Sequence, residues 1–128
     1  MPVRRAAIDH LTIGVSNLER SRAFYEAILA PLGLTHTQTS EVLPGEVEFG
    51  TESEHPFAIS TDYPSDAPVH VAFGADSVEQ VQAFHEAALA AGGTENGAPG
   101  LRPEYSPVYY GAFVLDPDGH NIEAVTRV

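Results

Sequence analysis

The chain contains an internal repeat with a period of sixty residues. The segment HLTIGVSNLERSRAFYEAILAPLGL, which begins at His10, aligns without a gap with HVAFGADSVEQVQAFHEAALAAGGT, which begins at His70, and ten of the twenty-five aligned positions are identical. A period of about half the chain predicts two copies of one supersecondary unit. Because a histidine opens each copy, the two histidines are candidates for a shared role.

Each copy begins with residues that alternate in polarity, which is typical of a strand with two different faces. In both copies the apolar residues share one face, and His10 or His70 shares the other face with small residues. The apolar faces are formed by Leu11, Ile13 and Val15 and by Val71, Phe73 and Ala75. We expect a helix to cover each apolar face and to leave the histidine faces free.

A helix is predicted after each of these strands, because residues of the capping-box type precede a run with apolar residues at helical spacing. The expected boxes are Ser16 with Glu19 and Asp76 with Glu79. Pro31, Gly33 and the pair Gly92 and Gly93 provide the stop signals.

Short strands separated by turn residues follow each helix. We expect them at 35–39, 45–50 and 56–60 in the first half and at 94–96, 108–115 and 121–126 in the second, with Asp116 to Gly119 as the hairpin turn between the last two. The sequence therefore predicts an α+β fold of tandem βαβββ modules that form a curved mixed sheet. Residues 1–128 make one domain, with module one at 8–62, a Pro-rich linker at 63–68 and module two at 69–128.

Composition excludes several classes of function. The chain has no cysteine and no lysine, which rules out thiolate metal sites, disulfides, Schiff-base catalysis and a lysine-dependent phosphate loop. Its net charge of −12 disfavours nucleic acid and anionic lipid as partners. The chain shows neither a membrane-length apolar run nor a signal peptide, so we expect a cytoplasmic protein.

The repeat, the histidine at the start of each module and the closing DPDGHNIEAV together resemble the vicinal oxygen chelate superfamily. This superfamily includes glyoxalase I, extradiol dioxygenases, fosfomycin-resistance enzymes and bleomycin-binding proteins. The resemblance covers Ile8 to Val125 and implies a half-barrel cup with the helices on its outer face. The fold hosts several chemistries as well as plain binding, so the resemblance does not fix the reaction.

The resemblance also implies a set of metal ligands. The family's ligand positions fall on His10, His70 and Glu123, a set of two imidazoles and one carboxylate that suits a divalent Fe, Mn, Ni or Zn ion. When HPFAIS is aligned with HNIEAV, Glu123 falls opposite Ala58, which cannot bind a metal, whereas glyoxalase I has a fourth protein ligand there. The alternative is that both histidines are ordinary strand residues and Glu123 is a solvated carboxylate.

Other polar residues are weaker candidates. Tyr105, Tyr109 and Tyr110 lie in or just before a strand that should border the cup, and we select Tyr105 and Tyr110 as possible acid/base or orienting residues, although packing is the alternative. Glu46 and Glu48 share one strand face and are either solvated or partners of the site. The other histidines are expected to be surface or turn residues, namely His36, His55, His85 and His120.

Three functions remain open at this point. The first is a metal-dependent lyase, isomerase or dioxygenase that acts on a small oxygen-rich molecule. The second is a non-catalytic drug-binding protein of the bleomycin-resistance type, which the acidity favours. The third, thiol transfer to fosfomycin, should need several cations, and Arg102 is the one basic residue expected near the cup. The open sheet edges predict a homodimer, and His10 could meet His70 of its own chain or of a partner.

Overall fold

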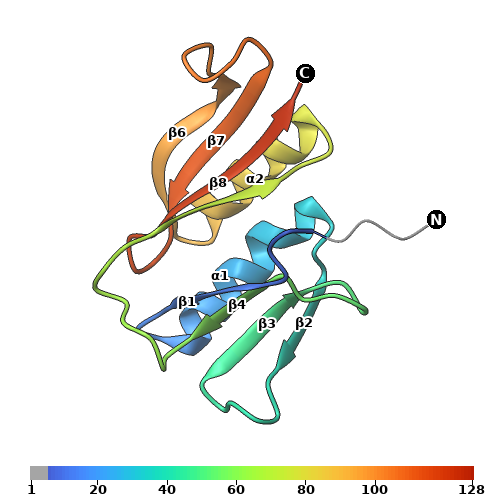
Figure 1. The fold of residues 1–128 in the computed structure, drawn as a ribbon. Helices are drawn as coiled ribbons and strands as arrows, with labels where there is room; N and C mark the ends of the chain where they lie inside the picture. Colours follow the sequence, from blue (N-terminus) through green and yellow to red (C-terminus); the bar gives the residue numbers. More distant parts are fainter. Residues whose placement is uncertain (1–5) are drawn as a thin grey trace, which may run out of the picture.

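A computed structural model describes residues 6–128 and shows two helices and eight strands in two modules (Figure 1). None of the helices in this part of the chain is long and apolar enough to cross a membrane. Module one contains β1 Leu11–Gly14, α1 Leu18–Leu29, a 3-10 turn at Ala30–Leu32, β2 His36–Thr39, β3 Glu46–Gly50 and β4 Phe57–Ser60. Module two contains β5 His70–Gly74, α2 Val78–Ala90, β6 Thr94–Leu101, β7 Tyr109–Leu115 and β8 Asn121–Arg127.

The two modules have the same sheet topology. The strand order is β1-β4-β3-β2 in one sheet and β5-β8-β7-β6 in the other, and each sheet joins its first and last strands in parallel and the rest antiparallel. The predicted α+β fold of two βαβββ modules is therefore confirmed, as two mixed sheets that do not close into a barrel.

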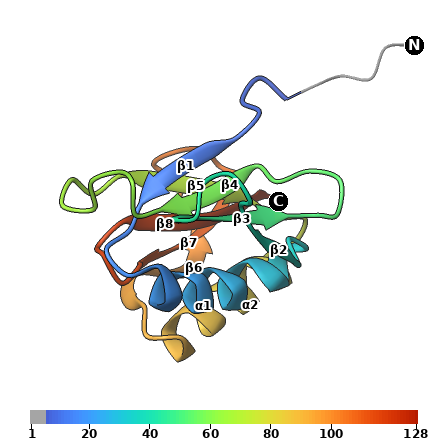
Figure 2. The same cartoon turned by 90° about the horizontal axis from the view of Figure 1, so that it is seen from below.

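Both helices lie on the same side of the sheets and pack against each other (Figure 2). They cover the apolar strand faces: Ile13 and Val15 are buried with the helix residues Phe24, Ile28 and Phe84. The opposite face of β5 is open, because His70, Ala72 and Gly74 are all exposed. The alternation in β5 thus separates a packed side of this strand from a side that is available for a site.

The helix caps lie one residue later than predicted. The side chains of Asn17 and Ser77, rather than those of Ser16 and Asp76, accept hydrogen bonds from backbone amides of the first turn. The Ser16 hydroxyl instead donates to Asp118, which lies 102 residues further along the chain. A capping box cannot form there, because its first residue already has a distant partner.

Strand β6 is longer than the predicted 94–96 and continues to Leu101, with irregular register against β7 between Glu95 and Gly100. Gly97 has φ 155 and makes this irregularity possible. The predicted turn between β7 and β8 is confirmed: the Gly119 amide donates to the Asp116 carbonyl at 2.9 Å, and Gly119 has φ 90.

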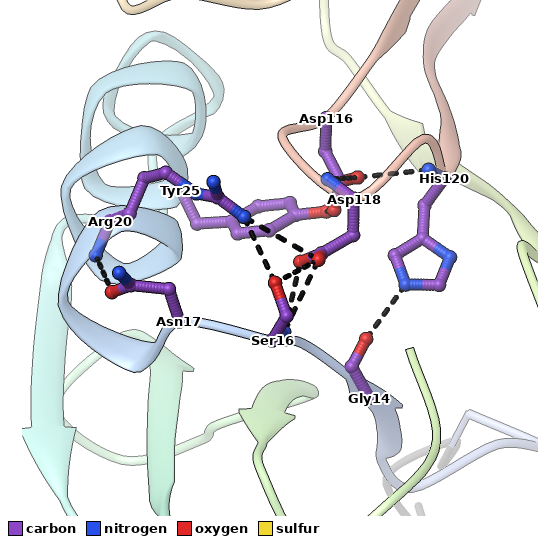
Figure 3. A network of polar contacts seen from close by, with 8 residues as sticks. All are labelled: Gly14, Ser16, Asn17, Arg20, Tyr25, Asp116, Asp118 and His120. Atoms are coloured by element: carbon purple, nitrogen blue, oxygen red, sulfur yellow. Dashed lines mark hydrogen bonds and ion pairs between the residues drawn. The ribbon is translucent and has the colours of Figure 1, made fainter. Parts of the chain in front are cut away.

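A buried polar network joins the two modules (Figure 3). The Tyr25 hydroxyl on α1 donates to the Asp116 carboxylate at 2.6 Å, and this carboxylate also accepts the amides of Asp118 and His120. Burial raises the pKa of Tyr25 well above its ordinary value, and the negative charge of Asp116 adds to this effect. The turn of module two is therefore held against the helix of module one.

His120 belongs to the same network and is not the surface turn residue that the sequence suggested. Its side chain is buried, its Nε2 lies 2.7 Å from the Gly14 carbonyl, and its Nδ1 accepts the Val69 amide at 3.0 Å. A neutral imidazole that donates from Nε2 satisfies both contacts. His120 therefore fixes the end of β1 next to the start of β5.

Candidate functional site

His70 and Glu123, two of the three expected metal ligands, lie in contact. His70 opens β5 and Glu123 lies in the parallel neighbour β8, where His70 pairs with Asn121 and Ala72 pairs with Glu123. The His70 Nε2 lies 3.1 Å from Glu123 Oε1. The Glu123 side chain is only 2% exposed, whereas that of His70 is 49% exposed. A buried carboxylate therefore faces an imidazole that solvent can reach.

The hydrogen bonds of His70 define what its Nε2 atom can bind. Its Nδ1 lies 2.9 Å from the Asn121 carbonyl, which only accepts, so Nδ1 must carry a proton. In the neutral imidazole Nε2 then presents a lone pair to the carboxylate oxygen of Glu123. His70 Nε2 and Glu123 Oε1 are then both acceptors, so their contact is favourable only with a positive charge between them, either a second ring proton or a bound cation. A metal-binding histidine typically has this arrangement, with its other nitrogen bound to a carbonyl.

Tyr109 holds the second oxygen of Glu123. Its hydroxyl donates to Glu123 Oε2, and burial together with this hydrogen bond raises the pKa of Tyr109 to about 12. Gly111, on the same strand, leaves room for the carboxylate, because a Cβ atom there would lie 3.1 Å from Oε2. Glu123 is thus fixed through one oxygen, while the other oxygen points at His70.

The structure places the two selected tyrosines away from this carboxylate. The Tyr110 hydroxyl accepts a hydrogen bond from Gln82 of α2, so Tyr110 lies on the helix side of the sheet. Tyr105 is 61% exposed and packs edge-on against the Tyr109 ring at 5.1 Å. Tyr109 was considered from the sequence but not selected, because alternation along β7 alone does not tell which of two adjacent tyrosines lies on the same sheet face as Glu123.

His10, the third expected ligand, lies elsewhere. It precedes β1, is exposed and contacts Asp9 through Nδ1 at 2.7 Å, a hydrogen bond that raises the pKa of His10. The bridge through His120 places Gly14, at the far end of β1, beside Val69. His10 is separated from that point by the length of β1, about 13 Å at strand spacing. Accordingly, residues 6–128 contain no group of three His, Cys, Asp or Glu residues arranged to hold a metal.

The corresponding face of module one carries its carboxylates on a different strand. Ala58 of β4 takes the place of Glu123 and pairs with Thr12 and Glu48. Glu48 accepts a hydrogen bond from Gln38 at 2.7 Å, and burial and the charge of Glu48 raise the pKa of Glu46. A groove of about 470 Å³ lies beside β2, and neither His70 nor Glu123 lines it. The contact between His70 and Glu123 is therefore on an open face and not in this groove.

The remaining histidines have partners that the sequence did not indicate. His85 is buried on α2 and lies 2.9 Å from Glu95, although we expected a surface residue. His36 Nδ1 and His55 Nε2 lie 2.8 Å apart in a partly buried pair. A possible signal was the alignment of His85 with Tyr25, since a buried helix position in one copy predicts a buried position in the other.

Two open βαβββ modules related by an internal repeat define the class of fold to which this chain belongs. The model of the Glyoxalase/Bleomycin resistance protein/Dioxygenase superfamily matches residues 7–124. The chain therefore belongs to this superfamily, as the repeat and the closing strand predicted.

Solved structures agree with this assignment. A glyoxalase/bleomycin resistance protein from Albidiferax ferrireducens T118 is 32% identical, with TM-score 0.80 and coverage of 96% of this chain and 100% of that chain. A family enzyme from Burkholderia phytofirmans PsJN, at 19% identity, and a lactoylglutathione lyase from Agrobacterium tumefaciens, also at 19%, have TM-scores of 0.70 and 0.68. The match to the Burkholderia enzyme covers 96% of this chain and 100% of that chain. The match to the lyase covers 95% of this chain and 94% of that chain. The last two show a shared fold only. No curated protein matches the chain.

Proposed function

We propose that this chain is a cytoplasmic, metal-dependent enzyme that acts on a small oxygen-rich molecule by lyase, isomerase or dioxygenase chemistry. His70 and Glu123 would bind a divalent Fe, Mn, Ni or Zn ion together with His10. The observation that carries the proposal is the contact of 3.1 Å between His70 Nε2 and Glu123 Oε1, in which Nδ1 already holds the ring proton. Two atoms that bind one metal ion through bonds of about 2.0–2.2 Å lie roughly 3 Å apart, so the observed spacing fits such an ion.

The third ligand would come from a second copy of the chain. His10 is about a strand length from His70 within one chain, yet both histidines are exposed. A homodimer that places module one of one copy against module two of the other would bring His10 to the partner's site, and twofold symmetry would form two such sites. The exposed face of β5 leaves space for this contact.

The chain's own residues would have separate tasks in such a site. A bound divalent ion would polarise neighbouring substrate oxygens and stabilise negative charge on them. Tyr109 would keep Glu123 in place through Oε2. The Asn121 carbonyl would keep the proton of the His70 ring on Nδ1, so that Nε2 is unprotonated. The Gly111 backbone leaves space for the carboxylate. Among these residues of the site, Glu123 alone would supply a negative charge.

Metal analysis of the untagged protein tests the proposal. We expect about one metal per chain after incubation with Fe, Mn, Ni or Zn and removal of unbound ions, and a loss of at least tenfold in affinity for Glu123→Gln, which keeps size but removes the charge. Glu104→Gln, an exposed change of the same charge next to Tyr105, is the control and should bind like the wild type. The absence of stoichiometric metal from the wild type with all four ions would contradict the proposal.

Mixing two defective variants tests whether the site is shared. At a metal concentration too low for either variant to bind alone, His10→Ala and Glu123→Gln chains that are refolded together should regain about a quarter of the wild-type metal content, because half of the dimers then hold one intact site. A site within one chain predicts no recovery. The non-catalytic alternative predicts instead that a cationic antibiotic binds with the same affinity with and without a chelator.

A further inference from the structure

The four arginines within residues 6–128 fall into two groups. Arg20 lies 3.5 Å from Asp118, and Arg22 lies 2.8 Å from Glu26. Within residues 6–128, Arg102 and Arg127 form no ion pair with a carboxylate, although the chain has 18 acidic residues and 6 basic ones. In such a chain a cation without an acidic neighbour is unusual, because Asp and Glu side chains outnumber the cations threefold.

Both of these arginines lie over rings that border the contact between His70 and Glu123. The Arg102 guanidinium lies 5.4 Å from the centre of the Phe113 ring, and that ring stacks on His70 at 6.1 Å with an angle of 22°. Arg127 lies 5.1 Å from the Tyr109 ring, whose hydroxyl holds Glu123. A guanidinium therefore lies on each side of the candidate site, separated from it by one aromatic ring.

Arg102 is held in place more firmly than Arg127. It is half-buried, whereas Arg127 is exposed, and its guanidinium donates to the Ala98 carbonyl at 2.6 Å and to the Leu101 carbonyl at 3.4 Å. The glycines of β6 make room for it, since a Cβ atom at Gly97 or Gly100 would lie 3.2 Å from a guanidinium nitrogen. A guanidinium has five N–H donors, so these two bonds leave others for a ligand.

We propose that Arg102 is the anion-binding residue of the site and that the substrate is a small organic acid whose carboxylate it holds. The assignment to a substrate rests on the proposed function, in which the oxygens that react lie at His70 and Glu123. The paired N–H donors of a guanidinium match the oxygen spacing of carboxylate and phosphate groups equally well. The net charge of −12 and the nearby Glu123 disfavour a dianion, and this selects the singly charged carboxylate. The exposed part of the half-buried Phe113 ring would pack against the carbon skeleton of the acid.

Binding of benzoate to the metal-free protein, followed by NMR, tests this assignment. We expect saturable shifts of the Arg102 Nε–Hε signal and of the Phe113 ring, with no such shifts for neutral benzamide. Arg102→Gln should weaken benzoate binding at least tenfold, and Arg102→Lys, which keeps the charge but loses the paired donors, should weaken it less. Arg22→Gln is the matched control, because it changes the net charge equally at a site remote from His70, and it should bind within a factor of two of the wild type.

Equal benzoate affinity in wild-type and Arg102→Gln protein would overturn the proposal, and so would tighter binding of phenylphosphonate than of benzoate, since that would select a dianion. Metal analysis of the same samples with Fe, Mn, Ni and Zn separates this inference from the proposed function. If none of the four ions binds but benzoate binding still depends on Arg102, the metal-dependent function fails and the anion site stands. If one of them binds but Arg102→Gln has no effect on benzoate, the anion site fails and the metal site stands.

Discussion

The two modules share one backbone plan, and two of the many positions at which they differ change their contacts, one on the last strand and one on the helix. On the last strand, Glu123 of module two corresponds to Ala58 of module one. On the helix, Tyr25 of module one corresponds to His85 of module two. Each difference changes what the module bonds to: Tyr25 reaches across to Asp116 of the other module, whereas His85 contacts Glu95 of its own.

This difference indicates a division of tasks between the repeats. Module two has the buried carboxylate, the tyrosine that holds it and the two arginines without acidic partners. Module one provides the helix to which the turn of module two is bonded and, under the proposed function, one histidine for a partner's site. The two repeats share a backbone topology, and their different side chains give each repeat its own contacts.

The largest effect is expected where module two bonds to module one. Asp116→Ala should lower the free energy of unfolding by about 3 kcal/mol, because it leaves the buried Tyr25 hydroxyl and two amides without their acceptor. Thr51→Ala changes the corresponding position of module one, which is exposed, and should cost less than about 1 kcal/mol. Urea unfolding followed by circular dichroism measures both. Equal losses of stability in the two variants would show that the contact of Asp116 with module one contributes no more than the corresponding exposed position.

The next effect sharpens the comparison within module two. Tyr109→Phe should weaken metal binding by about 10–100-fold, the typical range for a residue that orients a ligand, because Glu123 loses the donor to Oε2. Tyr110→Phe is the matched control, since it removes a hydroxyl from the next residue on the helix side, and it should leave metal affinity unchanged. Competition with a chromogenic zinc chelator gives both affinities. The same affinity in both variants would remove Tyr109 from the site.

Much of the fold follows from local sequence patterns. The alternation from His70 to Ala75 correctly separated a helix-covered face from an open one, and DPDG correctly predicted the last hairpin turn. In β1 the separation is incomplete, because Leu11 is exposed and Gly14 is buried against Tyr63 and Pro64. The family resemblance placed His70 and Glu123 in one expected ligand set, and the structure brings them into contact through the parallel pairing of β5 with β8. Local patterns suffice where one face must be buried, because the strand period then fixes the direction of every side chain.

Interactions between distant segments were not accessible in this way. The cap at Asn17 instead of Ser16 depends on Asp118, and the burial of His120 depends on Gly14 and Val69. The choice between Tyr109 and Tyr110 depends on the register between β7 and β8. The separation of His10 from His70 depends on how the modules pack, which no pattern within one module encodes.

The smallest effect concerns the helix position where the modules differ, and it depends on pH. The hydrogen bond from His85 lowers the pKa of Glu95, and the Gly97 amide adds to this. A carboxyl group with a lowered pKa stabilises the fold above its unfolded pKa, near 4.5, and this contribution disappears as pH falls through the lowered folded value. Glu95→Gln keeps an acceptor but not the charge, so at pH 6 its Tm should lie below that of the wild type by about 2 °C, a small shift typical of an exposed pair. The two melting temperatures should converge below about pH 3, since both side chains are then uncharged.

Glu86→Gln, an exposed change of the same charge on α2, should show no such pH-dependent difference. A gap between Glu95→Gln and the wild type that persists at low pH would mean that His85 packs in module two without an electrostatic role, as a purely structural counterpart of Tyr25.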